Sequence, residues 1–184
     1  MIARLVAQVH LPSVRALAHS SRACRIMSLP TLHHTFQIRF KAIDRLGPQI
    51  RTGHGILRKQ NSFQYVHRLI VDDGLTNQVN SKLIDQALAQ FPKIRYDAAA
   101  QEDHKARLAW QCLATLLRYL LSLRDLIFAC CRPFPECVLQ ALHTYRPSCR
   151  LHIRFLQWGR LANCRTSIEH QLVRSPCLFS VTAE

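Results

Sequence analysis

The sequence predicts a mixed α/β fold in which helices alternate with parallel strands. Two observations indicate this fold: four short stretches have the composition of strands, and segments with apolar residues at helical spacing lie between them. Alternation of this kind favours parallel strands whose connections cross over one face of the sheet. A chain of 184 residues with 48% hydrophobic content is long enough for one domain with a substantial core.

The predicted strands follow one another at regular distances along the chain. The first, 66–71, ends at a turn signal formed by 72–74. The second, 123–128, is uniformly apolar at its end, as in a buried parallel strand. The third, 149–155, alternates apolar and basic residues, which is the pattern of a strand with one buried face. The last, 178–183, lies near the end of the sequence.

Helices are predicted between these strands. Apolar residues recur at helical spacing between 108 and 121, and a second stripe of this kind lies between 79 and 91. Pro135 suits the first position of a helix over 135–145. A capping-box pattern at 166–169 predicts the start of one more helix.

A loose apolar template recurs through the same strands. It consists of an apolar residue, two others, an apolar residue, one other and an apolar residue. Its matches begin at Val66, Leu123 and Leu178, with a small residue in first place at Ser148 and a weaker match at Phe91. The steps between them are 25, 32, 25 and 30 residues, near the period of leucine-rich repeats. The spacing predicts an irregular leucine-rich-repeat-like array of alternating helices and parallel strands.

The stretch 11–40 has two interpretations. As a globular segment it is a short helix, a polar break and a strand-like end. As a targeting segment it is rich in arginine and serine, and no acidic residue appears before Asp44, as in a mitochondrial transit peptide. The repeat spacing downstream favours the globular interpretation, since an array needs a segment that leads into its first strand. Mitochondrial import stays open as the alternative.

The residues Leu17-Ala18-His19-Ser20-Ser21-Arg22-Ala23-Cys24 resemble the end of an F-box, which closes on a Leu-Ala-x-Val-Ser-Arg-x-Trp-like motif. The preceding apolar positions of the family correspond to Leu5, Val6, Val9 and Leu11. The chain as a whole is similar to the N-terminal portion of fungal F-box proteins with degenerate leucine-rich repeats. The Leu-Pro pair and acidic residue that open the family's motif are absent, so the resemblance implies an F-box truncated at its start.

This resemblance implies a non-catalytic substrate-recognition adaptor of a cullin-RING (SCF-type) ubiquitin ligase in the cytoplasm or nucleus. It divides the chain into an F-box-like helical segment over 1–40 and an incomplete leucine-rich-repeat-like region over 41–184. The F-box would present an apolar helical face to the ligase adaptor subunit, and the repeats would bind a substrate protein. A truncated, non-functional copy stays open. By resemblance, the adaptor-binding residues are Leu5, Val6, Val9, Leu11, Val14, Leu17, Ser21 and Arg22.

The net charge of +14 allows a further alternative, a basic nucleic-acid-binding module. Seven basic residues between 39 and 68 are interleaved with aromatic residues that could stack on bases. The basic set is Arg39, Lys41, Arg45, Arg51, Arg58, Lys59 and Arg68, and the aromatic set is Phe36, Phe40, Phe63 and Tyr65. No known nucleic-acid-binding signature accompanies them, so a solvated basic face explains them better.

The cysteine pattern does not predict a metal site or a disulfide framework. Cys131, Cys137, His143 and Cys149 recur every six residues, but six positions along a helix turn successive side chains to different faces. The paired C-x-x-C spacing of structural zinc sites is missing. The eight cysteines are better explained as thiols in a reducing compartment.

No motif in the sequence indicates an enzyme or a cofactor. Asp72 and Asp73 follow a strand, where carboxylates can hold magnesium, but Gly74 makes a turn the simpler explanation. No phosphate-binding glycine loop or nucleophile elbow is present. No apolar run reaches the roughly 18 residues that a membrane-spanning helix needs.

Overall fold

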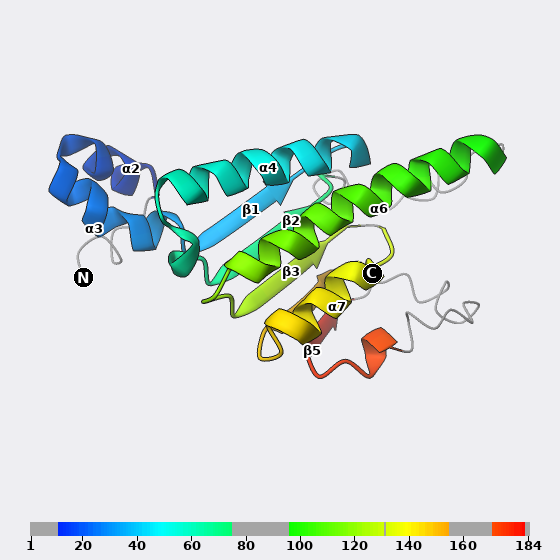
Figure 1. Cartoon of the computed structure of the whole chain (residues 1–184). Coiled ribbons are helices and arrows are strands. Elements are labelled where there is room, and N and C mark those ends of the chain that lie inside the picture. Colours follow the sequence, from blue (N-terminus) through cyan, green and yellow to red (C-terminus); the bar gives the residue numbers. More distant parts are fainter. Residues whose placement is uncertain (1–10, 75–95, 131, 155–170, 183–184) are drawn as a thin grey trace.

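The computed structural model describes residues 11–74, 96–130, 132–154 and 171–182, and its elements confirm the predicted mixed α/β class (Figure 1). Helices and strands alternate from β1 onward. In chain order the elements are α2 (Leu11–Ser20), α3 (Arg22–Leu32), β1 (Thr35–Arg39), α4 (Ile43–Lys59), the 3-10 helix η1 (Phe63–Tyr65), β2 (Arg68–Asp72), α6 (Tyr96–Tyr119), β3 (Asp125–Ala129), α7 (Glu136–Tyr145), β4 (Arg150–Arg154) and β5 (Leu178–Thr182).

The five strands form one parallel sheet in the order β1-β2-β3-β4-β5, which is also their order in the chain. Thr35, Arg68, Asp125 and Arg150 stand in one row across the first four strands. The register shifts at Leu151, where β4 meets β5. The order of these described strands never reverses, so the sheet has no topological switch point of the doubly wound kind.

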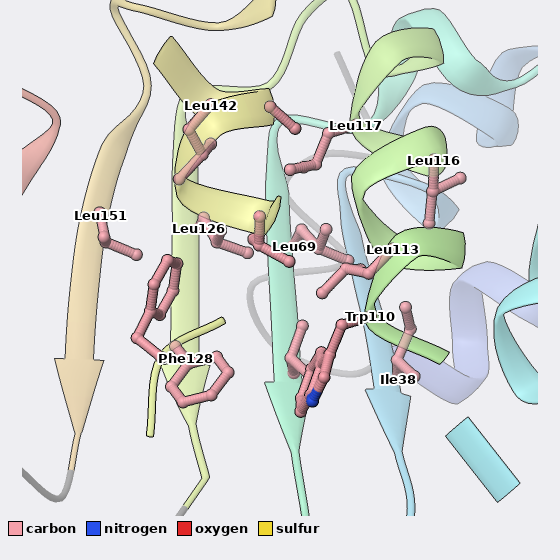
Figure 2. Close-up of a cluster of buried hydrophobic side chains, with 14 of the residues drawn as sticks. Ile38, Leu69, Trp110, Leu113, Leu116, Leu117, Leu126, Phe128, Leu142 and Leu151 are labelled. Carbon is pink, nitrogen blue, oxygen red and sulfur yellow. The ribbon is translucent and has the colours of Figure 1, made fainter. Parts of the chain in front are cut away.

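Helices α4, α6 and α7 lie side by side across one face of the sheet (Figure 1). That face holds a cluster of buried apolar side chains, which come from the strands and from α4, α6 and α7. Figure 2 shows its centre, in which strand residues Ile38, Leu69, Leu126 and Leu151 meet Trp110, Leu113, Leu116 and Leu117 of α6 and Leu142 of α7. Burial of this surface supplies the main stabilisation of the fold.

Helix α4 was missed by sequence analysis. Its buried side includes Leu46, Ile50 and Leu57, which recur at helical spacing, together with Gly47 and Gly53. The two glycines weaken the apolar stripe in the sequence, yet they allow close packing. A Cβ atom on Gly53 would lie 2.3 Å from the end of the Phe36 ring, so α4 approaches β1 more closely than an alanine allows.

The predicted strands are confirmed with boundaries shifted by one or two residues. The stretches 149–155 and 178–183 contain β4 and β5, and the stretches 66–71 and 123–128 overlap β2 and β3, which each end one residue later. The strand-like end of the stretch 11–40 is β1, so the sheet begins inside the range 1–40 that we assigned to the F-box-like segment.

The predicted helices have mixed outcomes. The stripe between 108 and 121 lies on α6 as far as Tyr119, and its last two residues follow the end of that helix. The helix expected from Pro135 is α7, whose N-cap is that proline. The stripe between 79 and 91, the start of the repeat match at Phe91 and the capping box at 166–169 lie outside the described residues. The last position of that repeat match, Tyr96, begins α6 instead of belonging to a strand.

The N-terminal unit consists of α2 and α3, which pack against each other beside the start of β1 (Figure 1). The predicted polar break is Ser21, which caps α3 and accepts a hydrogen bond from the Cys24 amide at 3.1 Å. A second helix therefore follows the break where sequence analysis expected a direct path to the first strand. None of the described helices is long and apolar enough to cross a membrane.

Candidate interaction surfaces

The strands present one set of side chains away from α4, α6 and α7. Neighbouring residues in a strand point to opposite faces of a sheet, so the residues between the buried core positions form a second surface. We call this surface the open face. It comprises Thr35, Gln37 and Arg39 of β1, Arg68, Ile70 and Asp72 of β2, Asp125 and Ile127 of β3, Arg150, His152 and Arg154 of β4, and Phe179 and Ser180 of β5.

Asp125 is the centre of the open face. Its side chain is only 10% exposed, and its carboxylate lies 2.7 Å from Arg150, 3.7 Å from Arg68 and 3.4 Å from Nε2 of His152. The two arginines stand directly opposite it on the neighbouring strands, where opposite charges stabilise a sheet. Both guanidinium side chains stay about half exposed, at 45% and 50%. Asp125 thus positions the side chains of Arg68 and Arg150 at the surface of the sheet.

A second ion pair lies at the other end of the strands. Arg39 donates to Asp72 with Nε 3.1 Å from Oδ2, and its side chain is 56% exposed. The other Asp72 oxygen accepts the amide of Gly74 at 2.7 Å, and Gly74 has a left-handed φ of 73°. Asp72 therefore closes a turn, which supports the turn interpretation of this sequence over a magnesium site. No group of three or more potential ligands is arranged to hold a metal in the part of the chain that the structure describes.

The two charged rows enclose an apolar centre. Arg68 and Arg150 belong to the row at the start of the strands, and Arg39 and Arg154 belong to the row at their end. The two rows are four residues apart along the strands, which corresponds to about 13 Å. Ile70 and Ile127 lie between the rows, in register with one another and half-buried. Four arginines and two aspartates leave the open face with a formal surplus of two positive charges.

Phe179 extends the open face at β5. Its side chain is among the large exposed apolar ones, with 62% of the residue accessible. The ring centroid lies 5.3 Å from Cζ of Arg150 and 5.2 Å from the ring of His152. The cation–π contact helps to hold Arg150 in place and leaves most of the ring accessible.

The open face also contains a line of serine, histidine and aspartate. Ser180 Oγ lies 2.8 Å from Nδ1 of His152, whose Nε2 lies 3.4 Å from Asp125. In a catalytic triad of serine, histidine and aspartate, the carboxylate hydrogen-bonds to the histidine and orients its ring. Here Asp125 lies closer to Arg150, at 2.7 Å, and belongs to an ion-pair ladder across three strands. Asp125 and His152 thus belong to this ladder, and Ser180 hydrogen-bonds to the histidine.

A second candidate surface lies on α3. Ala23, Ile26, Met27 and Pro30 are exposed and follow the spacing of one helical face. Ile26 is 57% exposed and Met27 is 70% exposed. We call these four residues the α3 stripe. Exposed apolar residues gathered on one helical face are typical of a protein-binding surface.

The structure places the predicted adaptor-binding residues in different environments. Leu5, Val6 and Val9 lie outside the described residues, as does the side chain of Leu11 at the start of α2. Val14 is fully buried and Leu17 is half-buried, so Val14 does not reach the surface of this chain. Ser21 and Arg22 are exposed at the start of α3, near the α3 stripe. The helical spacing of the stripe was the signal that could have revealed it.

The candidate zinc ligands are not brought together in the described residues. Cys131 lies outside them, and His143 on α7 hydrogen-bonds to Ser175 at 2.7 Å. Cys149 is buried in the core, where burial raises the pKa of its thiol to about 12, with a further contribution from Cys177 nearby. A thiol in this environment is a core residue rather than a metal ligand.

The predicted nucleic-acid residues are divided between two sides of the sheet. Arg39 and Arg68 belong to the open face, whereas Arg51 and Arg58 are exposed on α4, which covers the other face. The Phe40 ring is buried in the core. These residues therefore form no continuous basic surface with accessible aromatic rings.

Comparisons of the chain with family models, with curated proteins and with solved structures found no match.

Proposed function

We propose that this protein is a non-catalytic substrate-recognition adaptor of an SCF-type cullin-RING ubiquitin ligase. In this proposal, α2 and α3 bind the ligase adaptor subunit, and the sheet binds a substrate protein. The observation that carries the proposal is the architecture: five parallel strands in chain order, helices packed along one face, and a two-helix unit before the first strand. Leucine-rich-repeat proteins share this strand order and bind partners on the extended surface of their strands.

The α3 stripe supports the first half of the proposal. Helix-in-groove recognition requires an apolar helical face that the free protein leaves accessible. Ile26 and Met27 provide such a face, and the F-box-like motif from Leu17 to Cys24 spans the junction of α2 and α3 that positions it.

Co-purification of the full chain with the ligase adaptor subunit tests this half. We expect the wild-type protein to retain the subunit at micromolar concentration. The double variant Ile26→Asp/Met27→Asp should lose it, because two charges on an exposed stripe disrupt an apolar contact without disturbing the core.

The matched control is Leu108→Asp/Leu121→Asp, which places the same charges on exposed leucines 50% and 72% accessible and distant from α3 in sequence. It should bind like the wild type. A folded wild-type chain that retains no subunit, or equal losses in both double variants, would remove the ligase proposal.

Localisation provides an independent test. The proposal expects a C-terminal fluorescent fusion in the cytoplasm or nucleus. Co-localisation with mitochondria and loss of the N-terminal residues from the purified fusion would instead support the import alternative.

A further inference from the structure

The open face has mixed chemistry rather than a uniform positive charge. Asp72 and Asp125 stand among its arginines, and their carboxylates are held by ion pairs that also fix the strands. A nucleic-acid backbone carries a phosphate at every nucleotide and would meet these carboxylates repeatedly. A protein segment can match such a surface, because its acidic and apolar side chains are placed independently.

We propose that the open face binds an extended segment of a partner protein in which acidic and apolar side chains alternate. The surplus of two positive charges selects for acidic residues, and Ile70 and Ile127 provide an apolar base for the residues between them. This inference rests on the proposed function and deepens it, since it names the class of substrate segment that the sheet recognises.

The geometry allows both contacts at once. A segment that crosses the strands above Ile70 and Ile127 has an arginine row on each side of it. Each row is two residues from these isoleucines along the strands, which corresponds to about 7 Å. A guanidinium group on a long side chain can span this distance and bind a carboxylate through two parallel hydrogen bonds.

Two further features fit this ligand. Asp125 holds Arg68 and Arg150 in position, so these side chains are ordered before binding and less conformational entropy is lost. Phe179 lies beside Arg150 with 62% of the residue accessible, and it can pack on an apolar side chain at the end of the segment. Aromatic and arginine residues together are typical of the energetic centre of protein interfaces.

The test uses the full chain and a fluorescein-labelled peptide of alternating glutamate and valine, measured by fluorescence anisotropy. We expect saturable binding at or below about 100 µM, the range of a weak specific contact. A peptide with lysine in place of glutamate should not bind. A single-stranded DNA of the same formal charge should bind more weakly than the glutamate peptide.

Two double variants separate the open face from the overall charge. Arg68→Gln/Arg150→Gln removes two charges from the open face, and Arg51→Gln/Arg58→Gln removes two from α4. We expect the first to weaken peptide binding about tenfold and the second by less than about twofold. Arg154→Gln, at an exposed position of β4, is the variant to use if the first is poorly folded, and it should weaken binding about threefold.

Three results would overturn the inference. The first is a folded wild-type chain that does not bind the glutamate peptide, and the second is equal weakening by the two double variants, which would indicate a general charge effect. The third is tighter binding of the DNA with the same loss in the open-face variant, which would identify a nucleic-acid surface. Peptide binding needs no ligase subunit, so this result and the co-purification result can fail separately.

Discussion

The two faces of the sheet are built from the same strands with different chemistry. Leu126 and Ile127 are neighbours on β3, yet the first lies in the core under the helices and the second lies between arginine rows on the open face. The covered face consists of closely packed aliphatic and aromatic side chains. The open face consists of ion pairs with half-exposed arginines. The difference assigns stability mainly to the covered face, and it is the open face that we propose for partner binding.

Replacing each of these neighbours by alanine tests the comparison most strongly. Leu126→Ala should lower the free energy of unfolding by about 2–5 kcal/mol, because it leaves a cavity in a fully buried site. Ile127→Ala should cost only about 1 kcal/mol, because that side chain is half-buried. Urea denaturation followed by circular dichroism measures both. Equal costs would mean that the open face is packed as tightly as the core.

The covered face also depends on close helix packing, which two glycines of α4 test. Gly53→Ala should destabilise the protein by about 1–3 kcal/mol, because the new Cβ atom meets the Phe36 ring. Gly55→Ala should stabilise it by about 0.5–1 kcal/mol, since no atom lies within 4 Å and alanine favours the helix. Thermal unfolding of the two variants should move in opposite directions. A shift in the same direction would contradict the close approach of α4 to β1.

The ion-pair ladder should make a smaller contribution to stability. Asp125→Asn keeps the size of the side chain but removes its charge, and we expect a loss of about 1–2 kcal/mol. The two arginines are half exposed and regain water, which limits the loss. The denaturation midpoint of this variant measures it. A loss as large as that of Leu126→Ala would place stability on the open face as well.

A further effect on stability appears only at high pH, through the buried thiol of Cys149. Its pKa in the folded protein is about 12, above the ordinary value of 9.0, because burial disfavours the thiolate. The stability that this thiol contributes is therefore complete below pH 9 and is lost as the pH rises toward 12. Above pH 9, the free energy of unfolding of the wild type should fall faster with pH than that of Cys149→Ala. The two slopes should differ by at most about 1.4 kcal/mol per pH unit. Parallel pH profiles would show that water reaches this part of the covered face.

Cys24 on α3, which is only partly buried, provides the matching thiol. Hydrogen bonds with Ser21 and Ser20 lower the pKa of its side chain. At about pH 8, a thiol reagent should modify Cys24 in the native protein well before Cys149, which peptide mass spectrometry can establish.

The strands were predictable because their signal is local. The Arg-Leu-His-Ile-Arg sequence of β4 alternates basic and apolar residues, and this alternation both predicts a strand and separates its two faces. The parallel arrangement followed from the helices between the strands. The fold class and four of the described strands could thus be predicted from the sequence.

The candidate surfaces depended on longer-range information. Asp125 and its partners come from different strands, with 25 residues separating it from Arg150 and 27 from His152, so only the register brings them together. The α3 stripe was hidden because the serines before α3 and Pro30 within it are typical of loops. Helix α4 was hidden because Gly53 serves packing while lacking the apolar side chain that a pattern detects.

The chain order of the strands has a consequence for how such a protein can evolve. Each described strand pairs only with the strands before and after it in the sequence. A duplicated helix–strand unit would have to match one edge strand rather than a whole core, so such a unit can be gained or lost with little disturbance to the others. Each added strand would widen the open face by about 4.8 Å, and the partner segment that we propose could lengthen with it.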